Sequence, residues 1–165
     1  MTKPPELQRT ARRRNRRGFT IVELMTSLVI TSILAGMAIV KSKATIEQAK
    51  IAKAIGDIRA IQVEIQAFEV GGQPLPLSLA DVGRAQFLDP WGRPYEYINF
   101  DAVSRGGGVP PGARRDVFLV PINSTFDLYS RGPDGQSQPP LPAGPSQDDI
   151  VRGNDGGFIG VARKF

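Results

Sequence analysis

The sequence predicts an α+β fold in which one long N-terminal helix packs on a small antiparallel β-sheet. Two patterns predict the helix: an apolar run over residues 19–40, followed by apolar residues at every third or fourth position. Short β-rich runs separated by Gly and Pro dominate the second half of the chain and predict the sheet. The apolar stripe of the helix needs a cover, which a small antiparallel sheet supplies.

Residues 1–18 form a basic leader that ends at Gly18. Its basic residues, opposed by Glu6, are Lys3, Arg9, Arg12, Arg13, Arg14, Arg16 and Arg17. The whole chain has a net charge of +5, so the leader accounts for all of the positive excess. This distribution favours a topology signal, because Lys and Arg are retained on the cytoplasmic side of a membrane. It gives no support for a basic binding face elsewhere, and we expect no nucleic-acid partner.

Residues 19–40 are predicted to be a membrane-anchor helix. At about 1.5 Å per residue this run spans roughly 33 Å, which matches the apolar thickness of a bilayer. No small-residue cleavage site of the A-x-A type follows the run, so we expect it to stay on the mature chain. Its one charged residue is Glu23, and a lone carboxylate in lipid is costly unless it has a partner.

The helix is predicted to continue over residues 41–72 with a single apolar face. The residues that define this face are Ile51, Ile55, Ile58, Ile61, Ile65 and Phe68. Gly71-Gly72 and Pro74 end the pattern. Together with the anchor this gives one continuous helix of about 50 residues.

Residues 73–165 are predicted to form a β-rich region with a C-terminal loop. Strand-like runs occupy residues 94–100, 117–122 and 125–129, and the last two are separated by Asn123-Ser124, which suggests a hairpin. Residues 158–162 are predicted to form a final strand. Gly- and Pro-rich composition predicts loops over residues 101–115 and 131–149.

The chain contains no Cys and no His, which excludes several kinds of site. Disulfides, thiol catalysis and metal sites built on these two residues are absent, and so is any Ser-His-Asp or Cys-His arrangement. Oxygen ligands remain, and these suit Ca²⁺ or Mg²⁺. The sequence also has no phosphate-binding loop, so any ATP-driven work must be done by another protein.

The junction Gly18-Phe19-Thr20-Ile21-Val22-Glu23, with the apolar run, resembles the leader and anchor shared by type IV pilins and type II secretion pseudopilins. The resemblance implies cleavage between Gly18 and Phe19 by a prepilin peptidase and N-methylation of Phe19. It also implies that Glu23 meets the amino terminus of a neighbouring subunit, where each buried charge neutralises the other. The alternative is a plain signal anchor that carries a Glu by chance.

Three further segments resemble the major pseudopilin of type II secretion. They are DPWGRPYEY at residues 89–97, FDLYSRGPDGQ at residues 126–136, and Asp148-Asp149-Ile150. Ordinary type IV pilins lack this pattern, and many of them hold the C-terminal loop with a disulfide, which this Cys-free chain cannot form. The resemblance implies a pilin-like version of the α+β fold.

The same resemblance implies a calcium ion in the C-terminal loop. Carried over by position, Asp134, Asp148 and Asp149 would supply carboxylates, and backbone carbonyls near Arg131 and Ser146 would complete the shell. Oxygen ligands at irregular spacing suit Ca²⁺ better than Mg²⁺. The alternative is a solvated acidic turn without a metal.

The function implied by the resemblance is structural, and we expect the chain not to be an enzyme. Subunits would sit in the bacterial inner membrane as single-pass proteins, with the C-terminal domain in the periplasm. They would then stack with other copies into a helical periplasmic filament whose growth drives folded proteins across the outer membrane. The implied partners are minor pseudopilins, the inner-membrane assembly platform and the prepilin peptidase.

Two other functions are weighed against this one. A major or minor type IV pilin, for adhesion, motility or DNA uptake, would share the N-terminal junction but not the DPWG segment. A membrane-anchored enzyme such as a glycosidase would need two carboxylates facing each other about 5–10 Å apart, and no sequence pattern places such a pair in a cleft.

Overall fold

The computed structural model describes residues 18–103 and 108–165, except for the side chains of residues 38–42. The predicted leader therefore lies outside the described residues, apart from Gly18. The chain divides into two compact units, Met1–Ser42 and Lys43–Phe165.

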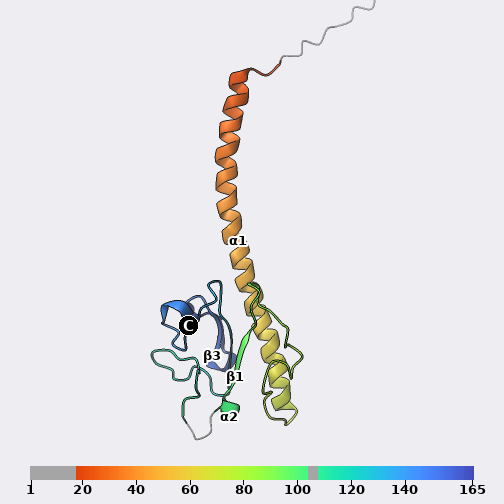
Figure 1. Ribbon diagram of the computed structural model, residues 1–165, viewed down its shortest axis with the longest axis vertical. Helices are drawn as coiled ribbons and strands as arrows, with labels where there is room; N and C mark the ends of the chain where they lie inside the picture. Colours follow the sequence, from red (N-terminus) through yellow and green to blue (C-terminus); the bar gives the residue numbers. More distant parts are fainter. Residues whose placement is uncertain (1–17, 104–107) are drawn as a thin grey trace, which may run out of the picture. The chain divides into compact units, whose positions relative to one another are not determined.

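Helix α1 covers Ile21–Val70 and contributes residues to both units (Figure 1). This confirms the prediction of one continuous helix. The helix ends where the sequence predicts, because Gly72 adopts a left-handed φ of 68° that favours glycine. The amides of Gly72 and Gln73 donate back to the carbonyls of Glu69 and Phe68, at 3.0 and 2.9 Å. This pair of bonds is a Schellman motif, which satisfies carbonyls left open at the helix end.

The sheet lies in the second unit and has four antiparallel strands in the order β1-β2-β3-β4. They are β1 (Glu96–Asn99), β2 (Phe126–Ser130), β3 (Ile150–Gly153) and β4 (Phe158–Val161). The α+β prediction is confirmed, and β1, β2 and β4 fall within or beside predicted strands. Strand β3 was not predicted, because its first residue was assigned to the acidic end of the loop.

The hairpin predicted from residues 117–122 and 125–129 is wrong. Strand β2 pairs with β1 instead, with Tyr97 opposite Leu128. The segment before it folds back on itself, since the Ile122 amide donates to the Arg114 carbonyl at 3.0 Å. The apolar side chains of residues 117–120 face solvent, with Phe118 88% exposed, whereas Ile122 is buried. A β-rich composition predicts a strand only where a partner strand is available to satisfy the backbone.

The main core of the second unit lies between the sheet and the later part of α1. Ile58, Ile61 and Ile65 are fully buried on the helix, as the apolar stripe predicts, and Ala54, outside the predicted stripe, is fully buried as well. These four share one cluster with sheet residues such as Leu128. The other predicted members, Ile51, Ile55 and Phe68, are partly buried. A smaller cluster gathers Ile122, Tyr129, Leu141, Val151 and Ala162. Successive residues of a strand point to opposite faces, which explains why neighbours on one strand belong to different clusters.

A short helix, α2 (Phe100–Val103), follows β1, where the sequence predicts the end of a strand at Phe100 and loop from residue 101. Three short 3₁₀ turns occur at Gly144–Ser146, Asn154–Gly156 and Ala162–Lys164. Each joins or ends elements of the sheet region.

Candidate functional site

Gly18 and Phe19 precede helix α1 and are both exposed. Phe19 is 79% exposed. A side chain built on Gly18 would meet none of the described atoms within contact range. Among the described residues, none covers the bond between Gly18 and Phe19, and cleavage there stays a prediction.

Glu23 takes part in the N-terminal cap of α1. Its backbone amide donates to the Thr20 hydroxyl at 3.2 Å, and its carboxylate accepts from the Thr20 amide at 3.5 Å. This reciprocal pair is a capping box, which satisfies two amides that have no partner within the helix. The sequence resemblance implies only an intermolecular role for Glu23 and none for Thr20. The signal was present in the sequence, because Thr-x-x-Glu before an apolar run is the pattern of a capping box.

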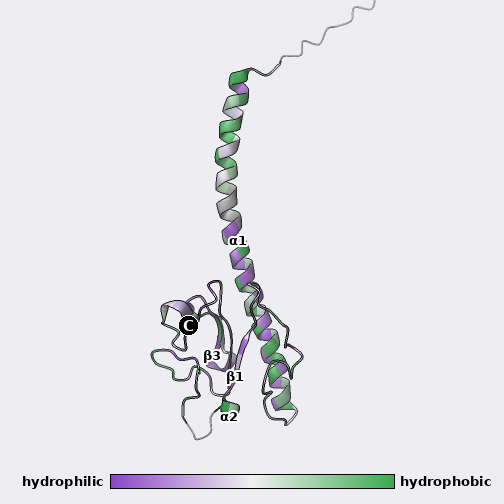
Figure 2. Cartoon of the chain, in the orientation of Figure 1, coloured by the Kyte–Doolittle hydropathy of each residue, from purple (hydrophilic) through white to green (hydrophobic). Residues whose placement is uncertain are grey.

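The first part of α1 presents apolar side chains on all sides, and every described side chain of residues 19–37 is exposed (Figure 2). Its hydroxyl side chains bond to carbonyls of their own helix. Thr31 and Ser32, for example, donate to carbonyls four residues earlier, at 2.7 and 2.6 Å. This surface therefore favours apolar surroundings, either lipid or other helices.

None of the helices in the described residues is long and apolar enough to cross a membrane. The side chains of residues 38–40, at the end of the predicted anchor, are outside the described part of the structure. The membrane anchor over residues 19–40 thus stays a prediction.

The segments that carry the second resemblance, residues 89–97 and 126–136, lie against each other in the second unit. The Ser130 hydroxyl donates to Asp89 at 2.6 Å, and the Arg93 guanidinium donates to the Gly132 carbonyl at 2.7 Å. Asp89 also accepts the amides of Trp91 and Arg93, which closes the turn between them. These contacts explain why the two motifs occur together in one chain.

Trp91 packs against the main core, and its indole donates to Glu47 of α1 at 2.6 Å. The residue therefore closes the turn over the helix rather than standing out as a free binding aromatic. It is the single tryptophan of the chain, so its fluorescence reports on the second unit.

In the C-terminal loop the structure brings Asp134 and Asp148 together. The Asp134 amide donates to the Asp148 carboxylate at 3.1 Å, while the Asp134 carboxylate accepts the Gln136 amide at 2.7 Å. Gly132 allows this close approach: its φ is 62°, and a side chain there would collide with the Asp148 carbonyl. Both carboxylates thus serve as acceptors for backbone amides.

The other predicted calcium ligands are engaged elsewhere. The Arg131 carbonyl accepts the Gly135 amide at 3.2 Å, and the Ser146 carbonyl accepts the Asp149 amide at 3.3 Å. The Arg131 side chain pairs with Glu96 on β1 at 2.6 Å. Each carbonyl oxygen keeps a second lone pair that could bind a metal. Whether a metal site exists therefore depends on how the three carboxylates are placed.

Asp149 is separated from the other two acids by its environment. It is fully buried and forms an ion pair with the buried guanidinium of Arg114. Burial raises the pKa of Asp149 to about 6, against the opposing effects of the Ser137 hydroxyl and the Arg114 charge. Asp148 next to it is only half-buried.

The residues present do not fit the three-carboxylate calcium site implied by the resemblance. Asp134 and Asp148 meet, but the Asp149 carboxylate faces Arg114, which is itself a cation. Among the described residues there is no group of three or more acidic side chains placed to hold a metal ion. Arg114 was missed in the sequence, where nothing distinguishes it from Arg115 beside it.

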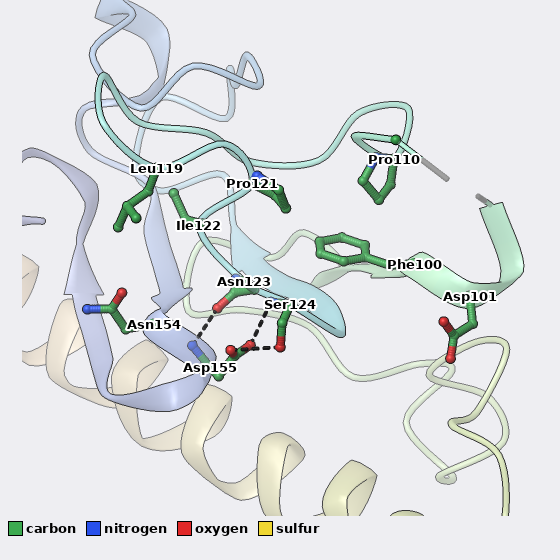
Figure 3. A pocket seen from close by; sticks show the side chains of 11 residues that line it. Phe100, Asp101, Pro110, Leu119, Pro121, Ile122, Asn123, Ser124, Asn154 and Asp155 are labelled. Carbon is green, nitrogen blue, oxygen red and sulfur yellow. Dashed lines mark hydrogen bonds between the residues drawn. The ribbon is translucent and has the colours of Figure 1, made fainter. Parts of the chain in front are cut away.

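A pocket of about 530 Å³ lies between the loop that precedes β2 and the turn that joins β3 to β4 (Figure 3). Its polar side chains hold that turn. Asp155 accepts the amide and the hydroxyl of Ser124, both at 2.8 Å, and Asn123 accepts the Asp155 amide at 3.0 Å. The other carboxylate of the lining, Asp101, lies on the opposite side of the pocket from Asp155. The pocket therefore offers no facing pair of free carboxylates among the residues described.

Comparison with known proteins agrees with both resemblances. Residues 13–39 match the family model for the prokaryotic N-terminal methylation motif. A protein of Pseudomonas aeruginosa named type II secretion system core protein G is 29% identical, over 86% of this chain and 96% of its own length. Proteins with the same name from Dickeya chrysanthemi and Escherichia coli are each 26% identical, over 87% and 73% of this chain and 90% and 83% of their own lengths. No solved structure gives a significant match.

Proposed function

We propose that this chain, a pseudopilin of the core protein G type, is the structural subunit of a type II secretion pseudopilus. Other copies would bury the apolar surface of its first helical segment in a periplasmic filament. Growth of that filament would drive folded proteins across the outer membrane. A type IV pilin is not favoured, because the relatives described above are all named core protein G.

The observation that carries this proposal is the surface of α1 over residues 21–37. Apolar side chains such as Leu24, Leu28 and Ile33 are more than half exposed around the helix. Soluble monomers rarely present so much continuous apolar surface, and surfaces of this kind mark interaction with membranes or with other proteins. A subunit that moves from a membrane into a helical bundle would bury the surface in both states.

The proposal includes processing and membrane insertion. A prepilin peptidase would cut between Gly18 and Phe19, and Phe19 would then be N-methylated. The subunit would cross the inner membrane once, with its second unit in the periplasm, until the assembly platform and the minor pseudopilins take it into the filament. Intact-mass measurement of the membrane-extracted chain tests this step, since we expect a methylated terminus at Phe19 and none after Gly18→Val.

We also propose that the chain is not an enzyme. The support is the lack of Cys and His together with the use of pocket side chains in holding turns. The energy for filament growth would come from an ATPase elsewhere in the machine.

Deletion of the gene from its host tests the function directly. We expect the secreted enzymes of the host to accumulate in the periplasm, while surface pili and motility remain. Loss of pili with normal secretion would support the type IV pilin instead, and normal secretion with normal pili would contradict both.

Complementation of the deletion separates assembly from folding. Glu23→Gln removes the charge in the first turn of α1 but keeps its shape, and we expect a processed, stable subunit that fails to restore secretion. Glu69→Gln makes the same change at an exposed site later on the same helix and should restore it. Equal secretion from the two variants would contradict the role of the Glu23 charge.

A further inference from the structure

Arg114 is a buried cation that joins three segments of the second unit. Its side chain is 2% exposed and pairs with Asp149 just before β3. The guanidinium donates to the Gln138 carbonyl at 2.5 Å and lies 4.2 Å from the Tyr129 ring of β2. A charged side chain is almost never buried unless it is paired in this way.

The backbone of Arg114 is fixed as well as its side chain. Its amide donates at 2.6 Å to Asp127, a fully buried residue of β2. Asp127 also accepts from Asn123 at 2.7 Å, and burial raises its pKa. The backbone that carries the guanidinium is therefore bound to the sheet through Asp127.

Asp149 completes the arrangement from the loop side. Its carboxylate accepts the Ser137 hydroxyl at 2.6 Å in addition to the Arg114 guanidinium. Among the described buried side chains, the atoms without a hydrogen-bond partner are Arg114 Nε and Asp149 Oδ1. One is a donor, the other is an acceptor, and both belong to this ion pair. A side-on arrangement of the guanidinium and the carboxylate would join these two atoms to each other.

The ion pair connects residues 35 positions apart and anchors the Pro-rich loop of residues 137–149 to the sheet. A calcium ion held by Asp134, Asp148 and Asp149 would make the same connection. A divalent cation next to the Arg114 guanidinium would instead bring like charges together in a poorly solvated place. The Arg114 guanidinium therefore disfavours a calcium ion at Asp149.

We propose that the Arg114 guanidinium takes the place of a calcium ion in this chain, so that the C-terminal loop folds onto the sheet without a metal. Asp134 and Asp148 then serve only as acceptors for the backbone amides of an exposed turn. This inference concerns the fold of the second unit and does not depend on the proposed function.

Calcium dependence of stability tests the inference on the unaltered protein. The full chain is purified in detergent, and thermal unfolding is followed through Trp91 fluorescence in EGTA, in millimolar calcium chloride and in millimolar magnesium chloride. We expect the same midpoint in all three. A ligand that binds only the folded state raises the midpoint, so a rise with calcium but not with magnesium would overturn the proposal.

Paired substitutions test the role of the guanidinium. In EGTA, Arg114→Ala should lower the folded-to-unfolded ratio at least about a hundredfold, because it leaves the Asp149 charge buried without a partner. Arg115→Ala removes an identical but exposed side chain and should change the ratio by no more than about twofold. Equal effects of the two changes would overturn the proposal.

If Arg114→Ala does not fold, a more conservative pair of substitutions at the same two positions provides the test. Arg114→Lys keeps the charge but loses the planar fork, and we expect at least about a tenfold loss relative to Arg115→Lys. On the acidic side, Asp149→Asn should lower stability more than Asp148→Asn. A larger effect at Asp148, or a stabilisation by calcium that Asp149→Asn abolishes, would point to a metal site instead.

Discussion

The two parts of helix α1 have the same backbone structure but differ in whether their apolar side chains are exposed or buried. Over residues 21–37 these side chains are exposed around the helix, whereas over residues 43–70 a single stripe is buried against the sheet. The second part is therefore stabilised within its own subunit. The apolar side chains of the first part can be buried only by lipid or by other proteins. Substitutions in the second part should therefore affect folding of the subunit, and substitutions in the first part should affect its assembly.

The largest effect expected from this comparison is on the buried stripe. Ile61→Ala should lower the free energy of unfolding of the second unit by about 2–5 kcal/mol, since it removes fully buried methylenes and leaves a cavity. Leu28→Ala, in the exposed part, should change it by no more than about 0.5 kcal/mol. Urea unfolding of the full chain in detergent, followed through Trp91, measures both. Similar losses of unfolding free energy from Ile61→Ala and Leu28→Ala would contradict the difference between the two parts of α1.

The bond between Glu47 and Trp91 should have the next largest effect. Glu47→Ala removes the carboxylate that accepts the indole N–H at 2.6 Å, and we expect a loss of about 1–2 kcal/mol in the same unfolding experiment. Glu47→Gln keeps an acceptor at this place and should lose less. A larger loss from Glu47→Gln than from Glu47→Ala would show that the bond does not hold the Trp91 turn.

A change in the cap at the start of α1 should act only on the exposed part. Thr20→Ala removes the hydroxyl that accepts the Glu23 amide and should weaken the first turn by about 1 kcal/mol. Amide exchange in that turn would then be about fivefold faster, while Thr20→Ser should keep the parent rate. Unfolding of the second unit should not change, and a change there would contradict the independence of the two parts.

The smallest effect is expected at the half-exposed ion pair of Glu64 and Arg84. The hydrogen bond from Arg84 lowers the pKa of Glu64, so the pair stabilises the fold above the ordinary glutamate pKa of 4.5. That contribution is lost as the pH falls through the lowered pKa. Glu64→Gln should therefore cost less than about 1 kcal/mol at neutral pH. The parent and Glu64→Gln should reach the same stability once the pH is below the lowered pKa of Glu64. A difference in stability that grows as the pH falls would contradict a stabilising role of this ion pair.

The sequence predicts those features that repeat or that sit in local motifs. The spacing from Ile51 to Ile65 predicts which face of the helix is buried, and Gly72 marks its end because few residues adopt its positive φ. Residues 117–122 have the composition of a strand but no partner strand, which composition alone cannot reveal. Pairing depends on residues far away in the chain, as the register of β1 with β2 illustrates.

In the candidate site, too, the features formed by neighbouring residues could be predicted, whereas those formed by residues far apart in the chain could not. The junction of Gly18, Phe19 and Glu23 is contiguous, so a sequence motif identifies it, and the capping box with Thr20 was visible in the same residues. The environment of Asp149 depends instead on Arg114, which lies 35 residues away in a loop without periodicity. Position alone placed Asp149 among calcium ligands, whereas the structure gives it a guanidinium partner.

The central claim is that the exposed apolar part of α1 is the surface that other copies bury. A cryo-electron microscopy reconstruction of filaments grown from this chain tests it most directly. We predict that residues 19–37 of neighbouring subunits pack together in the filament core, with Glu23 beside the amino terminus of another copy and the second unit on the outside. Filaments held together through the sheet, with this part of α1 exposed, would contradict the account.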